Sequence, residues 1–256
     1  MTTKLLAAVG NGLFVIVGTV IALRLLLLWR RTREWPELLI GGGMLLLPLV
    51  GLPCMVAAGI GSSRAADVNL VFLAAGLTAI GASITMLLSF TWRAFRPASP
   101  GAACFALGGG LLGFVVCALF FQSIASAPAD AVPREAYAPH TLQLRLVFQI
   151  WYVWTAFEAL LEWRRARRRL ALGLSDPVVV NRFALWGAMG FSLAFNGIVA
   201  LIMEAQGLNQ MRDALPAFWL ALHGLVASTL MFLTFVPPAA YLDWVRARHA
   251  AHTAAA

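Results

Sequence analysis

The sequence has few charged residues. Asp, Glu, Lys and Arg make up 12% of its 256 residues, whereas hydrophobic residues make up 61%. Soluble domains have about 25% charged and about 45–50% apolar residues. A soluble protein of this length has no interior large enough for so much apolar surface. The composition therefore excludes an ordinary soluble protein and predicts that lipid surrounds much of the chain.

Residues that carry most enzyme chemistry are also scarce. Lys4 is the sole lysine, so no lysine late in the chain is available for a retinal Schiff base. The three cysteines, Cys54, Cys104 and Cys117, lie inside apolar runs and form no CxxC pair, which favours buried thiols over a zinc site or a disulfide framework. We find no P-loop, dinucleotide fingerprint, HExxH motif or catalytic triad. These absences favour a protein that is not an enzyme, and we predict no cofactor apart from the haem alternative below.

The basic residues do not form a nucleic-acid surface. The formal net charge is +8, but the arginines stand in short clusters between apolar runs. A protein that binds a phosphate backbone needs a basic domain or stripe, and none is present. We therefore expect no nucleic-acid partner and attribute the arginines to membrane topology.

Seven apolar runs are long enough to cross a hydrocarbon core, which takes about 20 residues each. They are continuous and lack the alternation of a membrane β-barrel, so the predicted fold is an all-α seven-helix bundle. The first run has no cleavage site of a signal peptide and is expected to be retained. The predicted spans lie near 5–28, 37–60, 68–91, 101–121, 141–163, 178–203 and 216–240. We expect a single domain over 1–248 and a short disordered tail over 249–256.

The arginines also predict the orientation of the chain. Fourteen Lys and Arg residues fall on one side of the predicted spans and five on the other. Because the richer side is normally cytoplasmic, we place the N-terminus outside and the C-terminus in the cytoplasm. The membrane we expect is the bacterial cytoplasmic (inner) membrane.

Four apolar runs end on the same pattern, Trp followed by Arg: "LLLLWRR" at 25–31, "LLSFTWRAFRP" at 87–97, "LLEWRRARRR" at 161–169 and "YLDWVRAR" at 241–248. Trp is enriched at the headgroup level of a membrane, and Arg in the cytoplasmic water beyond it. We interpret the pattern as four interface anchors on the helices that run from outside to inside, not as a catalytic motif.

Polar residues deep in the spans are the best functional signal, because lipid makes such groups costly. Asn11, Asn196 and His223 lie about 8–9 Å outward of the middle of their predicted helices, and Gln149 lies deeper. In a ring of seven helices these side chains converge below the outer loop. We predict that they bind a small ligand, with an interhelical hydrogen-bond layer as the structural alternative.

A second polar layer is expected toward the cytoplasm. Glu158 is the one acid well inside a span, and Arg24 and Arg182 lie at a similar depth. We expect Glu158 to pair with Arg182 or Arg24, with a proton-coupled role as the alternative. Trp151 and Trp154 share a helix face with Glu158 by their i, i+3 and i+7 spacing and are predicted to line the ligand pocket.

Three functions follow from these features. The first is a receptor-like or sensory bundle that binds a small ligand in its outer half and signals to a cytoplasmic partner at the basic 163–177 loop. The second is a small secondary transporter, proton-coupled through Glu158. It is supported if the chain consists of two parallel three-helix repeats on either side of the fourth run. The other way to divide the chain is into three similar hairpins followed by a seventh helix. The third is a haem-handling or assembly factor that uses His140 and His223 as axial ligands.

Overall fold

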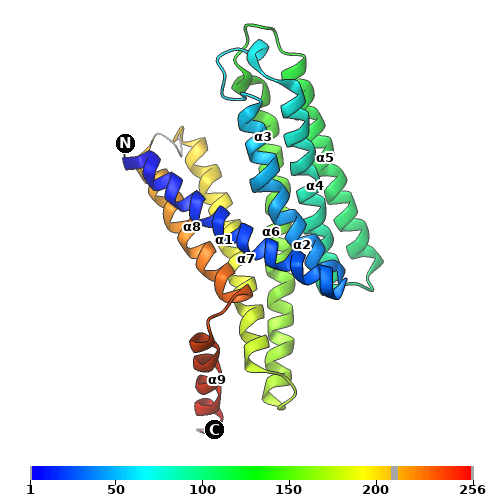
Figure 1. Ribbon diagram of the computed structural model, residues 1–256, viewed down its shortest axis with the longest axis vertical. Helices are drawn as coiled ribbons and strands as arrows, with labels where there is room; N and C mark the ends of the chain where they lie inside the picture. Colours follow the sequence, from blue (N-terminus) through cyan, green and yellow to red (C-terminus); the bar gives the residue numbers. More distant parts are fainter. Residues whose placement is uncertain (1, 209–212, 255–256) are drawn as a thin grey trace. The chain divides into compact units, whose positions relative to one another are not determined.

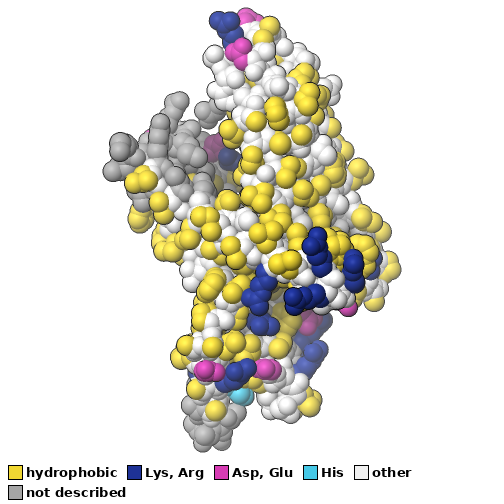
Figure 2. Space-filling model, viewed as in Figure 1, with side chains coloured by type: hydrophobic (Ala, Val, Ile, Leu, Met, Phe, Trp, Pro, Cys, Tyr) yellow, Lys and Arg dark blue, Asp and Glu magenta, His cyan; other side chains and the backbone are white. Residues whose placement is uncertain are grey.

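The computed structural model describes residues 2–208 and 213–254 and leaves the side chains of 2–4, 6–8, 10, 11, 134 and 251–254 undescribed. Within these residues the chain is helical and contains no strand (Figure 1). Seven helices or helix pairs are long and apolar enough to cross a membrane, which confirms the predicted all-α class and the number of spans. Apolar side chains are spread over the surface visible in Figure 2, and many large ones are exposed, as expected for helices that contact lipid.

The helices follow the predicted runs closely. Their bounds are α1 (Thr2–Thr32), α2 (Trp35–Leu45), α3 (Leu52–Ala57), α4 (Leu70–Phe95), α5 (Pro100–Ala125), α6 (Pro133–Ala171), α7 (Pro177–Ala205), α8 (Ala214–Phe235) and α9 (Ala239–Ala254). The second predicted run, 37–60, forms a single span, Trp35–Ala57, made of α2, a π-helical segment and α3.

The π-helical segment, Leu46–Gly51, contains Pro48, and Pro53 follows in α3. Proline removes a backbone donor and disturbs the α-helical ladder, and a π-helical turn is one way in which a helix absorbs that change. The span continues through the disturbance because its neighbour α4 packs along it. Ser83 of α4 donates a buried hydrogen bond of 2.7 Å from its Oγ to the Gly43 carbonyl.

The structure corrects the predicted 163–177 loop. α6 has 39 residues and ends at Ala171, so the five arginines between Arg164 and Arg169 belong to a helix. Only 172–176 connects α6 to α7. The reason is that Leu, Ala and Arg are strong helix formers, and no glycine or proline interrupts them before Gly173. The outer start of α6 is also earlier than predicted, because Pro133 begins the helix at a position that proline favours.

The C-terminal end also differs from the expected one. The seventh span ends at Phe235, not near residue 240, since Pro237 and Pro238 follow and the residue before a proline avoids the helical conformation. α9 then runs from Ala239 to Ala254, so 249–254 are helical where we expected a disordered tail.

The chain divides into two compact units, whereas the sequence predicts one domain over 1–248. The second unit, Ala22–Trp151, is built around α4, which packs against α2, α3 and α5. One end of it is closed by two connections that pair through their backbones, with Ala65 N–H donating to the Ala131 carbonyl at 2.8 Å. In the same unit the rings of Phe120 and Tyr137 stack with centroids 4.9 Å apart.

The first unit contains Met1–Ile21 and Tyr152–Ala256, and α7 is its central helix. A Cβ atom at Gly190 of α7 would lie 2.8 Å from the Ala156 Cβ atom, so the backbones of α7 and α6 approach closely there. α9 is fixed to α7 by a 2.9 Å hydrogen bond from Asn181 Nδ2 to the Tyr241 hydroxyl.

Each of the four tryptophans at the Trp-Arg run ends forms a cation–π pair with a nearby arginine. The guanidinium-to-ring-centroid distances are 5.3 Å for Arg33 over Trp29, 4.3 Å for Arg93 over Trp92, 5.0 Å for Arg167 over Trp163 and 5.4 Å for Arg248 over Trp244. The pairing holds each guanidinium beside the ring that prefers the headgroup layer. The recurring pattern therefore has a structural role.

Candidate functional site

The first unit contains a polar ladder between α7 and α8. Its two rungs join residues one helical turn apart on each helix. Trp219 Nε1 donates to Asn196 Oδ1 at 2.9 Å, and His223 Nδ1 lies 3.3 Å from Ser192 Oγ. The Trp219 ring also meets Phe195 edge to face, with centroids 5.8 Å apart. Two of the predicted ligand residues, Asn196 and His223, thus belong to the same polar ladder.

The second nitrogen of His223 makes the ladder a candidate binding site. Nε2 is buried and has no hydrogen-bond partner among the described residues. Such an atom is rare in a folded protein and marks a place that a water or a ligand completes. Which nitrogen carries the proton depends on the direction of the Ser192 hydrogen bond, so Nε2 faces its environment either as a donor or as an acceptor.

The depth of this site differs from the expected one. Because α8 ends at Phe235, His223 lies only about 2 Å from the middle of that helix instead of about 8 Å. Asn196, one turn along α7, is farther toward the predicted outer side. The ladder therefore starts near the middle of α8 and extends toward the predicted outer side.

The other predicted ligand residues lie elsewhere. The side chain of Asn11, on α1, is outside the described residues. Gln149 belongs to the second unit, where its Oε1 is buried without a hydrogen-bond partner among the described residues. Trp151, in the same unit, is buried and donates from Nε1 to Thr91 Oγ1 of α4 at 3.1 Å. The ligand role of these three residues remains a prediction.

Glu158 is a buried acid in α6, 5% exposed. Trp154, one turn earlier, donates from Nε1 to Glu158 Oε1 at 3.1 Å, which joins two of the three residues expected on one helix face. Arg24 and Arg182 are both surface-exposed. The ion pair between Glu158 and one of these arginines remains a prediction.

The haem alternative rests on two histidines that lie in different units. His140 Nδ1 is 3.0 Å from Gln143 Oε1, one turn along α6, and His223 belongs to the ladder. The described residues include no cluster of three or more His, Cys, Asp or Glu side chains that suits a metal ion.

Sequence reasoning missed half of the ladder. Ser192 and Trp219 are ordinary residues of a membrane helix, but each stands four residues from a residue that we had selected. The spacing puts Ser192 with Asn196, and Trp219 with His223, on one helix face. This i, i+4 spacing is the signal that the sequence offers, and it identifies the rungs only once α7 and α8 are known to be neighbours.

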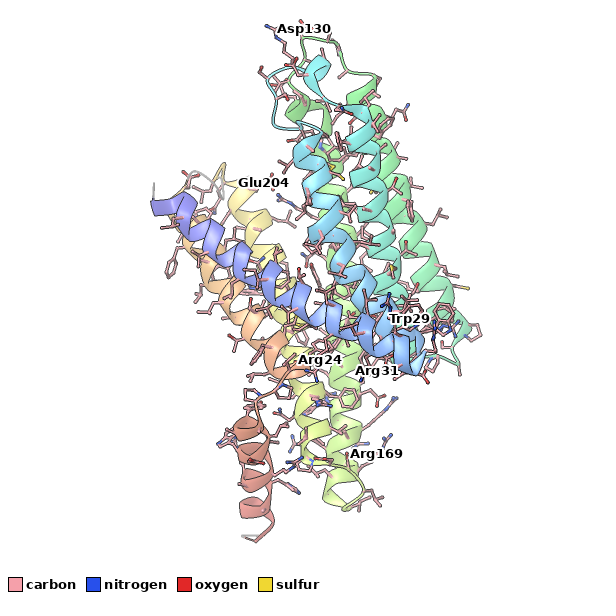
Figure 3. All side chains as sticks on the ribbon, in the orientation of Figure 1. Arg24, Trp29, Arg31, Asp130, Arg169 and Glu204 are labelled. Carbon is pink, nitrogen blue, oxygen red and sulfur yellow. The ribbon has the colours of Figure 1, made fainter. Side chains whose placement is uncertain are left out.

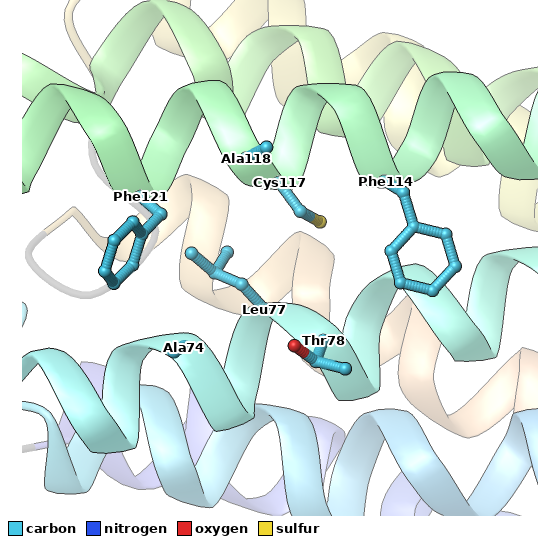
Figure 4. A pocket seen from close by; sticks show the side chains of 7 residues that line it. All are labelled: Ala74, Leu77, Thr78, Phe114, Cys117, Ala118 and Phe121. Carbon is cyan, nitrogen blue, oxygen red and sulfur yellow. The ribbon is translucent and has the colours of Figure 1, made fainter.

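The second unit contains an apolar groove between α4 and α5, shown in Figure 4. Its volume is about 240 Å³, and its lining residues are Ala74, Leu77, Thr78, Phe114, Cys117, Ala118 and Phe121. The two phenylalanine rings, two turns apart on α5, stand at opposite ends of the groove. The Thr78 hydroxyl and the Cys117 thiol are its only polar side-chain groups, so its chemistry suits an aliphatic chain. No sequence pattern distinguishes these residues from other apolar positions.

Comparisons with protein-family models, curated proteins and solved structures found no match for this chain.

Proposed function

We propose that this chain is a receptor-like integral membrane protein that binds a small, partly apolar ligand between α7 and α8. The observation that carries the proposal is the buried Nε2 atom of His223, which has no hydrogen-bond partner among the described residues. A ligand hydroxyl group completes that nitrogen in either tautomer, and a ligand carbonyl group does so when Nε2 carries the proton. The adjacent Trp219 and Phe195 rings suit an apolar body.

The ladder also offers a route to the basic end of the protein. α8 carries His223 and is followed by Pro237 and Pro238, after which α9 is fixed to α7 through Asn181 and Tyr241. A ligand that changes the spacing of α7 and α8 would act on α9 through this contact with α7. A cytoplasmic partner would then detect the change in the position of α9.

Native mass spectrometry of the detergent-purified protein tests the proposal. We expect a small molecule to co-purify with the wild-type chain and its occupancy to fall at least about tenfold in His223→Phe, which keeps the ring shape but removes both nitrogens (about 1.4 kcal/mol). His140→Phe is the matched control, because it makes the same change in the other unit. An empty wild-type protein, or equal occupancy in both variants, contradicts the proposal. Loss of a bound haem in both variants supports the haem-handling alternative instead.

A small proton-coupled transporter is the second candidate, supported by the buried Glu158 and its hydrogen bond from Trp154. A buried acid in a membrane helix is a recurrent element of proton pathways. We expect wild-type protein in liposomes to carry a proton current under a solute gradient and Glu158→Gln to abolish it, with Glu162→Gln, near the helix end, as the control. A liposome that stays proton-tight with the wild-type protein excludes this function.

A further inference from the structure

α6 extends beyond any hydrocarbon core. Its 39 residues span about 58 Å, whereas the core of a bilayer is about 30 Å thick. Trp163 marks the interface, and the next six residues carry five arginines within about 9 Å along the helix. The arginines are therefore held on a helix at headgroup depth. Figure 3 labels the last of them, Arg169, near the end of α6.

The five arginines form a fan around one side of α6. Ala166, in their middle, is 4% exposed and faces the protein, whereas all five arginines are exposed. With about 100° of rotation per residue, they cover an arc of about 200° centred opposite Ala166. Packing of Ala166 thus fixes the rotation of the helix and directs the whole charged arc outward.

α7 and α9 add three arginines to this end of the first unit. Arg182 is exposed on α7, one residue after Asn181, whose side chain binds α9. Arg246 and Arg248 are exposed on α9, whereas Val245 beside them in the sequence is buried. We call these eight arginines the basic end of the first unit.

Few local acids neutralise the basic end. Arg165 pairs with Glu162, and Arg246 lies 3.5 Å from Asp243. The other six have no ion pair among the described residues: Arg164, Arg167, Arg168, Arg169, Arg182 and Arg248. Six guanidinium groups without ion pairs repel one another, and this repulsion destabilises the protein unless an anionic partner binds to the surface.

Two of these six arginines lie over interface tryptophans. Arg167 is 5.0 Å from the Trp163 ring centroid, and Arg248 is 5.4 Å from that of Trp244. A guanidinium that stacks on an indole keeps its N–H edge free, and that edge matches the oxygens of a phosphate group. Because tryptophan prefers the headgroup layer, we expect the N–H edges of Arg167 and Arg248 to lie closer to lipid phosphates than to a soluble protein.

We propose that the basic end of the first unit is a binding surface for the headgroups of anionic phospholipids in the leaflet beside it. This surface is distinct from the α7–α8 ladder and does not depend on the ligand proposed there. The attraction falls off within a Debye length of the surface, about 8 Å at physiological salt, and the five arginines of α6 lie within a similar length, about 9 Å along the helix.

Lipid retention in native mass spectrometry tests this surface. The full-length protein is extracted from vesicles of equal parts phosphatidylglycerol and phosphatidylcholine, and bound phosphatidylglycerol is counted for each variant. We expect at least about a fivefold loss when Arg164, Arg167, Arg168 and Arg169 are changed to Gln, equivalent to about 1 kcal/mol. The control changes Arg30, Arg31, Arg33 and Arg93 of the second unit to Gln, removing the same charge at the ends of other helices. Retention within twofold of wild type in the first variant overturns the proposal.

Two further measurements keep the test decisive if a variant folds poorly. Phosphatidylglycerol retention by the wild-type protein must fall as sodium chloride rises from about 0.1 to about 1 M, because salt screens such contacts. Retention that ignores salt overturns the proposal. Poly-glutamate is the probe for an acidic protein partner. If it binds equally to wild-type protein in nanodiscs with and without phosphatidylglycerol, lipid does not occupy the surface. That result also overturns the proposal.

Discussion

At the scale of single residues, polar side chains in the spans bond across helix pairs. Ser83 reaches a carbonyl of α2, Trp151 reaches Thr91 of α4, and Trp219 reaches Asn196 of α7. In lipid no water replaces a lost partner, so each of these bonds ties two specific helix faces together. They select which helices become neighbours.

Ser83→Ala is expected to destabilise the second unit. Ser83 is fully buried, and its loss leaves the Gly43 carbonyl beside the Pro48 disturbance without its cross-helix donor. Interhelical bonds in membranes contribute about 0.6 kcal/mol on average and up to about 1.7, so we expect a decrease of about 1 kcal/mol in the free energy of unfolding. The measurement is unfolding in mixed micelles of rising SDS content.

Ser228→Ala is the control for that change. Ser228 is also buried, but its hydroxyl donates to Gly224 within α8, so its removal separates no helices. An equal loss of stability in both variants contradicts the role given to the Ser83 bond.

The sequence identified some of these residues and missed others for a physical reason. Asn196 and His223 stand out because their polar groups are costly in lipid whatever surrounds them. Ser192 and Trp219 do not stand out, because a hydroxyl satisfies itself within its own helix and an indole tolerates an apolar site. Their role depends on what the neighbouring helix presents.

At the scale of helices, two glycines within apolar helices differ in what packs against them. Gly190 lies where α7 touches α6, with the Ala156 Cβ atom 2.8 Å from the position of an added Cβ atom. Gly108 of α5 has no atom within 4 Å of the corresponding position. Both are glycines within an apolar helix, where small residues often allow close helix approach, and of these two only Gly190 lies at such a contact.

Gly190→Ala is therefore expected to separate α6 from α7. The added methyl group meets the backbone of Ala156 as well as its side chain, and overpacking of this kind costs about 1–3 kcal/mol. We expect a lower apparent Tm in detergent for this variant. Gly108→Ala adds the same methyl group without a contact and is expected to leave the Tm unchanged or higher. A Tm for Gly190→Ala that equals that of Gly108→Ala refutes the close contact.

The ends of the helices depend on prolines and helix-forming residues that the hydrophobic pattern of the sequence does not show. Pro237 and Pro238 end the seventh span five residues early, and the arginines after Trp163 prolong α6 by two turns. The hydrophobic window locates a span because lipid requires apolar residues. It does not locate the end of the helix, because a helix continues into water wherever propensity and packing allow it.

At the scale of the molecule, charge is distributed unequally within each unit. In the first unit Arg169 and Glu204 mark opposite ends, and in the second unit Arg31 and Asp130 do so (Figure 3). Basic residues thus collect at one end of each unit, as the positive-inside rule requires of a chain with cytoplasmic arginines.

Cysteine labelling tests the proposed orientation. In a chain with Cys54, Cys104 and Cys117 changed to Ala, we introduce either Ser63→Cys or Leu172→Cys, both at exposed positions in connections between spans. A membrane-impermeant maleimide is expected to label Ser63→Cys in intact cells and Leu172→Cys only after permeabilisation. The reverse pattern shows that the N-terminus is cytoplasmic.

The sequence by itself determined that this chain is helical and that it has seven runs long and apolar enough to span a membrane, because lipid imposes these features on any chain. It placed Trp244 at the end of the seventh run, but in the structure that span ends at Phe235 and Trp244 lies on α9. It also selected Asn196, His223 and Glu158 by the cost of burying them. Only the tertiary structure decided that Ser192 and Trp219 complete the ladder, that an apolar groove lies between α4 and α5, and that the arginines after Trp163 form a fan on a helix. These depend on which faces of two helices meet, and no single helix encodes its neighbour.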